Sequence, residues 1–137
     1  MHENCVFCKI VNGEIPSIKV YEDQKVLAFL DISPASKGHC LVVTKEHFDN
    51  FLTCPPDLLA YVFQIAQKIG QAMVVSLHAD GINILTNVNK IAGQSVFHFH
   101  VHIIPRYKED KLGIPFEPTA IEKFNLPTLA NQIKEKL

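Results

Sequence analysis

The segment HFHVHIIPR, residues 98–106, places a histidine at every second position of an otherwise apolar stretch. In a β-strand successive side chains point to opposite faces, so His98, His100 and His102 are predicted to share one face. The alternating apolar residues then share the other face: Phe97, Phe99, Val101 and Ile103. The segment therefore predicts a strand with one chemical face and one core face, closed by Pro105.

The rest of the chain predicts further strands and a few helices. Apolar and β-branched residues indicate extended segments at 18–23 and 24–32, paired as a hairpin, and at 39–44, 81–87 and 96–105. Helices are expected at 45–52, from about Pro55 through Met73, and at 127–137. Because the strands follow one another more than they alternate with helices, the pattern favours an α+β domain. We expect an antiparallel sheet of about five strands with helices packed on one side.

Composition limits the possible classes of function. A chain of 137 residues with 47% hydrophobic residues suits a single domain with one core. The formal net charge of -1 provides no excess of basic residues, so we expect no nucleic-acid partner. No apolar run approaches the roughly 20 residues of a membrane span, and the start MHENCVFCKI does not resemble a signal peptide. We therefore expect a cytoplasmic protein with no membrane partner.

Three imidazoles on one strand face permit two kinds of chemistry. Histidine is a common ligand of zinc, so the face could form a metal site. A neutral imidazole can also attack phosphorus while a second, proton-bearing imidazole serves the leaving group. The preceding loop AGQS, residues 92–95, adds an amide and a hydroxyl that can hold phosphate oxygens without adding charge. On these residues alone both chemistries remain open.

The stretch GQSVFHFHVHII, residues 93–104, closely resembles the signature of the histidine triad, or HIT, nucleotide-binding family. Two further stretches are similar to family segments: VFCKIVNGEIPS, residues 6–17, and AFLDISPASKGHCLVV, residues 28–43. The resemblance implies a single HIT domain over residues 1–137. Residues 1–106 match the family, with the similarity beginning at about residue 5, and residues 107–137 form a variable C-terminal loop and helix.

The resemblance implies a catalytic role for a set of residues around the signature: His100, His102, His98, His39 and Ser95. In this assignment His100 is the nucleophile that attacks the α-phosphorus of a nucleotide and forms a covalent nucleotidyl intermediate. His102 holds the phosphate and handles the leaving-group proton, and His39 orients the triad. Gln94 and Ser95 match family positions that contact the phosphate and the leaving group.

The same resemblance implies a nucleoside pocket. Asp31 is similar to the carboxylate that accepts hydrogen bonds from the ribose hydroxyls, because a carboxylate can accept two donors at once. Asn87 resembles a polar residue beside the phosphate. Four apolar residues resemble the walls around a purine ring: Phe7, Ile10, Phe29 and Ile32. From residue type alone, those four are interpreted as ordinary core residues.

Cys5 and Cys8 form a C-x-x-C pair, which by itself is compatible with zinc, with redox chemistry or with two free thiols. Some bacterial HIT proteins and the related hexose-phosphate nucleotidylyltransferases resemble this chain in having such a pair. That likeness implies a structural zinc ion held by Cys5, Cys8, His47 and His98. The competing assignment keeps His98 in the hydrogen-bonded triad without a metal. No organic cofactor is expected.

The leaving group and the oligomeric state stay open. The first expectation is hydrolysis of a purine nucleoside phosphoramidate, and the alternatives are cleavage of diadenosine polyphosphates or nucleotide binding without turnover. The resemblance implies a homodimer that pairs through a helix and a sheet edge. The apolar stripe from Leu58 to Met73 could serve this pairing, or it could cover the sheet of its own chain.

Overall fold

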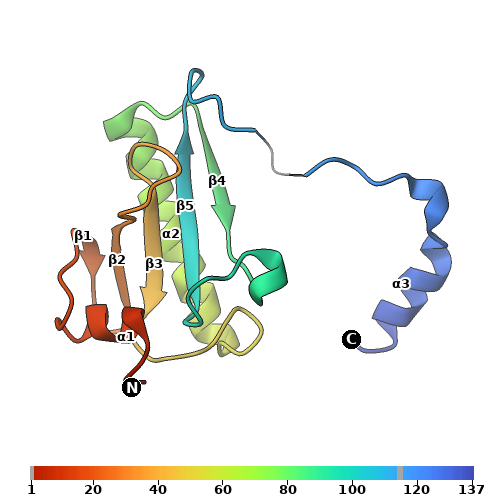
Figure 1. The fold of residues 1–137 in the computed structure, drawn as a ribbon, viewed down its shortest axis with the longest axis horizontal. Helices are drawn as coiled ribbons and strands as arrows, with labels where there is room; N and C mark the ends of the chain where they lie inside the picture. The colour runs from red at the N-terminus through yellow and green to blue at the C-terminus, as the bar shows by residue number, and fades with distance from the viewer. Residues whose placement is uncertain (1, 114–115) are drawn as a thin grey trace.

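The computed structural model describes residues 2–113 and 116–137 and contains a five-stranded sheet. Its strands are β1 (Lys19–Glu22), β2 (Val26–Leu30), β3 (Cys40–Thr44), β4 (Gly81–Leu85) and β5 (His100–Arg106). They lie in the order β1-β2-β3-β5-β4, and every neighbouring pair is antiparallel (Figure 1). The predicted antiparallel α+β fold is therefore confirmed, with β5 as an interior strand.

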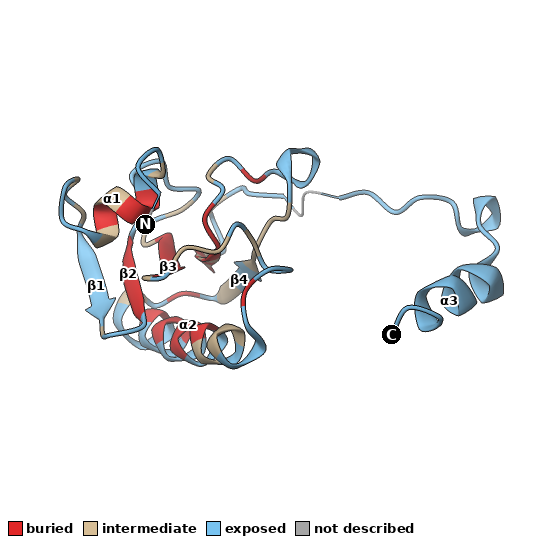
Figure 2. Ribbon diagram, turned by 90° about the horizontal axis from the view of Figure 1, so that it is seen from below, coloured by how far each residue is buried: buried red, intermediate tan, exposed pale blue. Residues whose placement is uncertain are grey.

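The long helix α2 (Pro56–Leu77) covers one face of this sheet, and the short helix α1 (Val6–Val11) lies on the opposite face (Figure 2). The apolar stripe of α2 packs against the sheet of its own chain, through Val62, Ile65, Ala66, Ile69 and Met73. Of the two roles considered for this stripe, the structure therefore supports the one that covers the chain's own sheet.

Helix α2 has the length and apolarity of a membrane span. It has 22 residues and contains a window of mean hydropathy 1.3. The sequence has no continuous apolar run of this length, so this property was not expected. Burial of one face against the sheet accounts for this composition. The expectation of no membrane partner stays a prediction.

Side-chain alternation gives the sheet two separate apolar clusters. On the α2 face the strands contribute Val26, Ala28, Cys40, Val42, Val101 and Ile103. On the α1 face a smaller cluster contains Phe7, Ile10, Leu27, Phe29, Leu41 and Val43. Because β5 places its odd-numbered residues in the first cluster, its even-numbered histidines face α1.

Two predicted elements differ from the structure. Strand β5 begins at His100 rather than at residue 96, and Phe97 is 48% exposed instead of facing the core. The strand also continues through Pro105, which was expected to close it, to Arg106. The segment 45–52 forms turns rather than a helix. Asn50 accepts a hydrogen bond from the Leu52 amide with its side chain, and such local bonds compete with helix formation. The amide of Phe99 donates to the carbonyl of Phe48, which ties the two irregular segments together.

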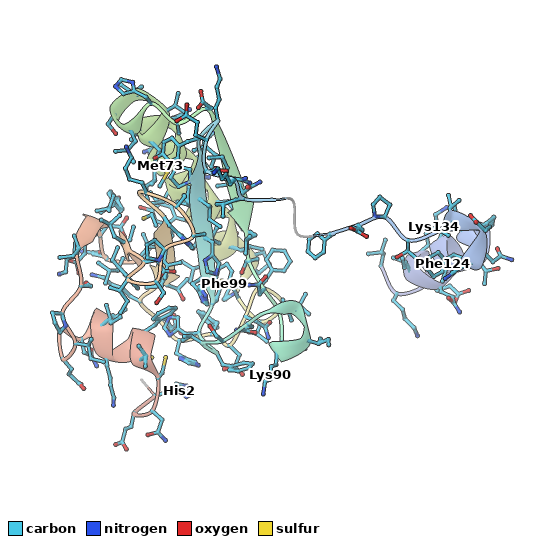
Figure 3. The ribbon with its side chains drawn as sticks, turned by 45° about the horizontal axis from the view of Figure 1, so that its top comes forward. His2, Met73, Lys90, Phe99, Phe124 and Lys134 are labelled. Carbon is cyan, nitrogen blue, oxygen red and sulfur yellow. The ribbon has the colours of Figure 1, made fainter. Side chains whose placement is uncertain are left out.

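The C-terminal part of the chain leaves the domain. Residues Ile121–Lys123 form a 3-10 turn, and helix α3 (Leu126–Lys134) follows, close to the predicted helix at 127–137. Every residue from Phe116 to Leu137 is exposed. Figures 1 and 3 show this segment, with Phe124 and Lys134, lying away from the sheet.

Phe99 is 1% exposed and lies in the cluster between α2 and the sheet, so Phe99→Ala should leave a cavity there. We expect the free energy of unfolding to fall by about 3 to 5 kcal/mol, measured by urea denaturation. Phe97→Ala is the matched control, because this ring is half exposed, and it should cost less than about 1 kcal/mol. Equal losses for the two variants would contradict the assignment of Phe99 to the core.

Candidate functional site

The pairing of β2, β3 and β5 brings four polar residues onto the face that α1 partly covers. His100 pairs with Val43 and His102 pairs with Leu41, so both histidines lie beside β3. His39 immediately precedes β3 and Asp31 immediately follows β2, and the Asp31 amide donates to the His39 carbonyl at 2.9 Å. Three adjacent strands therefore bring together residues that are up to 71 positions apart in the sequence.

A hydrogen bond fixes the protonation pattern of His100. Its Nδ1 lies 2.6 Å from the backbone carbonyl oxygen of His98, an atom that can only accept. Nδ1 must therefore carry the proton, and the neutral ring keeps an unprotonated Nε2. The edge of the Phe7 ring packs against His100 with the ring centroids 4.8 Å apart. His100 is thus a buried imidazole whose free lone pair is on Nε2.

A second chain of hydrogen bonds defines the tautomers of His39 and His102. The Ala35 amide donates to His39 Nδ1 at 2.9 Å, so the proton of a neutral His39 is on Nε2. His39 Nε2 lies 3.0 Å from His102 Nδ1 and therefore donates to it. Neutral His102 then carries its own proton on Nε2. The result is one ring with a free lone pair, His100, beside one ring with a free N–H group, His102, with centroids 5.0 Å apart.

Burial keeps these histidines neutral near neutral pH. Desolvation, with the neighbouring His100 and His39 charges, lowers the pKa of His102 to about 4. Burial also lowers the pKa of His100 and of His39, and in both cases the nearby Asp31 carboxylate opposes the shift in part. Asp31 Oδ2 lies 3.6 Å from His39 Nε2, so it stabilises whatever positive charge reaches His39.

A second cluster, of thiols and imidazoles, lies at the start of α1. Cys8 Sγ lies 3.3 Å from His47 Nδ1 and 3.5 Å from His98 Nδ1, and Cys5 Sγ lies 3.3 Å from His98 Nδ1. The four ligand atoms all lie within 4.8 Å of one another. In a tetrahedral zinc site sulfur and nitrogen ligands stand about 3.5 Å apart. The donor set and its spacing therefore fit zinc.

Outer hydrogen bonds orient both imidazoles of this cluster. His98 Nε2 lies 2.6 Å from the Thr44 carbonyl oxygen, and His47 Nε2 lies 3.0 Å from Asp49 Oδ1. Each Nε2 therefore donates outward, and each Nδ1 presents its lone pair to the thiols, the arrangement usual for metal-binding histidines. The ring of His98 thus faces the cysteines, and it is its backbone carbonyl that contacts His100.

The remaining predicted phosphate-binding residues lie in the loop before β5. The buried Gln94 side chain accepts a hydrogen bond from the Asn89 amide at 2.8 Å and donates one to the Asp49 carbonyl at 2.7 Å, so it holds the shape of this loop. Asn87 donates to the Gly93 carbonyl at 3.4 Å. Gly93 has a φ of +103°, which favours glycine at this turn. Ser95 is exposed and lines a hollow of about 380 Å³ beside Cys5 and His47.

The four predicted purine-wall residues separate into two groups. Phe7, Ile10 and Phe29 are buried together in the cluster between α1 and the sheet, as expected for core residues. Ile32 is 94% exposed and joins no cluster of the described residues. The structure therefore brings Phe7 next to His100 but leaves Ile32 apart.

Sequence reasoning missed the groups that orient the histidines. The Ala35 amide and the Thr44 carbonyl are backbone atoms, for which residue type gives no signal. Asp49 lies only two residues after His47, so its hydrogen bond to the His47 ring could have been suspected from the sequence. His2 is exposed, and its ring stacks on that of His47 with the centroids 3.7 Å apart.

Known proteins share both the sequence and the fold of this chain. A model of the HIT domain matches residues 12–109. The protein "hit" of Bacillus subtilis is 45% identical over 98% of this chain and 95% of its own length. The adenylylsulfatase HINT3 of Arabidopsis thaliana is 41% identical over 82% of this chain and 57% of its own length.

Solved structures agree with these relatives. SMU.412c of Streptococcus mutans superposes with a TM-score of 0.93 at 46% identity, over 99% of this chain and 87% of that chain. A HIT family protein of Bacillus subtilis gives 0.91 at 43% identity, over 98% of each chain. A zinc-bound histidine triad family protein of Mycobacterium smegmatis gives 0.77 at 39% identity, also over 98% of each chain.

The fold and the site together define a class of protein, an α+β domain that presents clustered neutral histidines on the open face of an antiparallel sheet. The chain belongs to the HIT family, whose members bind or hydrolyse nucleotides.

The lowered pKa of His102 predicts how stability depends on pH. Between about pH 4 and pH 6.5, the ordinary pKa of histidine, the folded chain binds fewer protons than the unfolded chain. The contribution of a neutral His102 to stability is therefore complete above pH 6.5 and is lost as the pH drops toward 4. In His102→Gln this loss should be smaller by about 1 kcal/mol, less than the full shift because solvent screens a half-buried ring. Urea denaturation from pH 4.5 to 7.5 measures it. His78→Gln, at an exposed histidine, should keep the wild-type slope, and an unchanged slope in His102→Gln would refute the assignment.

Proposed function

We propose that this protein is a nucleotide hydrolase that cleaves purine nucleoside phosphoramidates at the α-phosphate. The observation that carries the proposal is the hydrogen bond from His100 Nδ1 to the His98 carbonyl, which leaves the Nε2 lone pair free as a nucleophile. In the first step His100 Nε2 attacks the α-phosphorus, and the bond from phosphorus to the leaving amine nitrogen breaks. The product is a nucleotidyl-histidine.

His102 serves the leaving group in this scheme. Its Nε2–H, set by the chain Ala35–His39–His102, donates a proton to the departing amine. His102 is left with a free Nε2, which then accepts a proton from the attacking water. Water oxygen bonds to phosphorus, the bond to His100 breaks, and AMP is released with both histidines in their starting tautomers. When His102 gives up its proton, the hydrogen bond donated by His39 Nε2 stabilises the negative charge left on its ring. The nearby Asp31 carboxylate stabilises the positive charge of the nucleotidyl imidazolium on His100.

The choice of leaving group rests on the Ser95 hydroxyl of the AGQS loop and on the DISP segment, residues 31–34, which resemble the phosphoramidase branch of the family. The relative HINT3 is an adenylylsulfatase, which supports nucleotide hydrolysis in general. The ending HIIPR, residues 102–106, favours diadenosine polyphosphates, which are the second candidate substrates. Gln94, Asn87 and Asp31 stay predicted nucleotide contacts.

We also propose a structural zinc ion at Cys5, Cys8, His47 and His98. Bound there, zinc would tie α1 to the segments that flank β3 and β5, as the ligand spacing and the zinc-bound relative support. A cytoplasmic location and a homodimer remain predictions of the same kind.

The nucleophile assignment predicts a covalent adduct. Rapid mixing with an adenosine phosphoramidate, followed by acid quench and mass spectrometry, should give a mass increase of one adenylate on His100. His100→Ala should lose the adduct and at least about 10⁴-fold in kcat/KM while still binding AMP. His78→Ala, at an exposed histidine, should behave as wild type. An adduct that persists in His100→Ala would sink the assignment, and retained AMP binding without any adduct would favour a binding module.

The role of His102 predicts a dependence on the leaving group. An amine needs a proton to depart and a sulfate does not, so His102→Asn should lower the rate of nucleotidyl-histidine formation from adenosine phosphoramidate about 10²- to 10⁴-fold. With adenylyl sulfate the loss in this first step should be much smaller. Rapid-quench measurements of adduct formation with both substrates give the ratio, and equal losses would contradict proton donation by His102. Comparison with diadenosine polyphosphates decides between the two candidate substrate classes.

The zinc proposal predicts a change in metal content. Cys8→Ser should lower bound zinc from about one ion per chain to less than a tenth of that, because one of four ligands is replaced by a poor one. Elemental analysis of the dialysed protein gives the stoichiometry. Cys54→Ser is the control, since this buried thiol lies outside the cluster. A zinc-free wild type, or a Cys8→Ser variant that keeps its zinc, would contradict the site.

A further inference from the structure

The C-terminal arm, residues 116–137, carries an apolar helix face that packs on none of the chain's other described residues. Leu126, Leu129 and Ile133 lie on one side of α3 at the i, i+3 and i+7 spacing of a single stripe, and they are 50%, 41% and 64% exposed. The opposite side of α3 carries Thr128 and Asn131. A short helix gains most of its stability from packing such a stripe, so this arrangement is incomplete within one chain.

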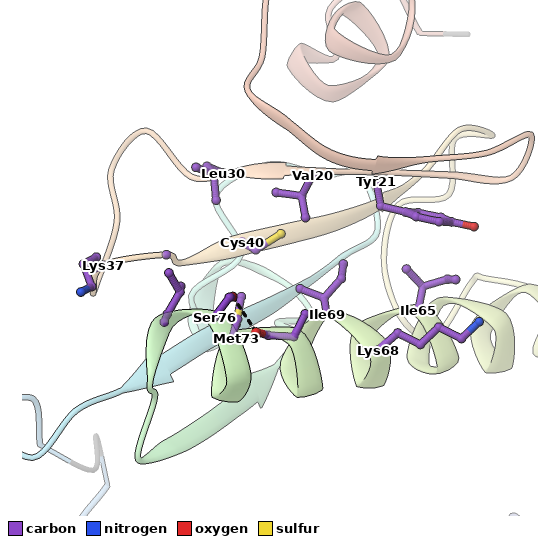
Figure 4. Close-up of a pocket in the computed structure, with 13 residues that line it drawn as sticks. Val20, Tyr21, Leu30, Lys37, Cys40, Ile65, Lys68, Ile69, Met73 and Ser76 are labelled. Carbon is purple, nitrogen blue, oxygen red and sulfur yellow. Dashed lines mark hydrogen bonds between the residues drawn. The ribbon is translucent and has the colours of Figure 1, made fainter.

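The domain has an apolar groove of matching character on its α2 side. Helix α2 packs mainly on β3, β5 and β4 and leaves the face of β1 and β2 partly uncovered. The groove between them has a volume of about 530 Å³, and Figure 4 shows Val20 and Leu30 on one wall and Ile69 and Met73 on the other. A groove lined by aliphatic side chains on two walls is a shape that receives amphipathic helices.

The course of the arm is shared with solved relatives. The structure from Streptococcus mutans superposes over 99% of this chain at a TM-score of 0.93, and that from Bacillus subtilis over 98% at 0.91. Superpositions that extend over nearly the whole chain at such scores include the arm. We infer that an arm which packs on none of the other described residues, yet lies within such superpositions, is held by something outside its own chain.

We propose that α3 of one chain docks in the groove between α2 and the β1–β2 hairpin of a second copy. The arm leaves the domain past β4, the edge strand of the sheet, on the side away from its own β1–β2 hairpin (Figure 1). The ten residues of the arm before α3, which include the 3-10 turn Ile121–Lys123, can span up to roughly 29 Å, close to the width of a domain of this size. The arm therefore reaches across a neighbouring copy, and exchange of two arms completes both grooves.

Photocrosslinking tests this assignment in the full chain. With p-benzoylphenylalanine in place of Leu129, irradiation should give a covalent dimer on a denaturing gel. Peptide mapping should place the link on α2 between residues 65 and 77 or on β1. A link within one chain would show α3 folding back onto its own groove, and a link elsewhere, or none, would show a different site. Each of these results overturns the proposal.

A variant of the groove separates specific docking from chance encounters. Ala72 is exposed and lines the groove, so Ala72→Glu should keep the fold and place a charge against the α3 stripe. In the crosslinking chain it should lower the yield of covalent dimer at least about tenfold. Gln71→Glu adds the same charge at the neighbouring exposed position outside the groove and should leave the yield unchanged. Equal yields in the two variants would overturn the proposal.

A matched pair of arm variants extends the test to the free protein. Leu129→Asp with Ile133→Asp should raise the dimer dissociation constant on the order of 100-fold, measured by sedimentation velocity. Thr128→Asp with Asn131→Asp adds the same charge to the opposite side of α3 and should not change it. An unchanged constant in the first variant would contradict a contribution of α3 to association. Neither variant alters a residue of the histidine cluster, so the outcome is independent of the proposed reaction.

Discussion

Strand β5 has to satisfy two different surroundings at once, and the rest of the site depends on how it does so. Val101 and Ile103 enter the core against α2, while His100 and His102 face the opposite side, toward α1. A shift of one residue in its pairing with β3 would bury the imidazoles in the apolar core and expose the aliphatic side chains. Because such a shift would cost free energy, the pairing register of β5 is fixed. This register places the histidines beside His39 and Asp31.

His98 connects the two polar clusters. Its ring faces Cys5 and Cys8, and its carbonyl oxygen accepts a hydrogen bond from His100 Nδ1. The position of this one residue therefore affects both the packing of α1 and the tautomer of His100. Burial lowers the pKa of His98 to about 4 in the absence of a metal, so its ring is neutral and its Nδ1 can serve as a ligand near neutral pH.

Two apolar surfaces, the α3 stripe and the groove beside α2, are left uncovered by the residues that the structure describes. They lie far apart on one chain, and the α2 stripe that could have served as a contact surface is used by the chain's own core. The histidine cluster faces the other side of the sheet, so assembly through the groove and chemistry at the cluster use separate surfaces.

The sequence by itself determined most of the strands and the two-faced character of β5, because alternation is a local pattern. The members of the two clusters outside β5 and the C-x-x-C pair were assigned only through the resemblance to the HIT family. The sequence did not reveal that residues 45–52 are irregular, because the hydrogen bond from the Phe99 amide to the Phe48 carbonyl joins distant segments and forms only in the folded chain. Nor could it assign tautomers, which depend on the Ala35 amide and on the His98 and Thr44 carbonyls. Backbone groups are the same in every residue, so only the tertiary structure decides which imidazole nitrogen each of them meets.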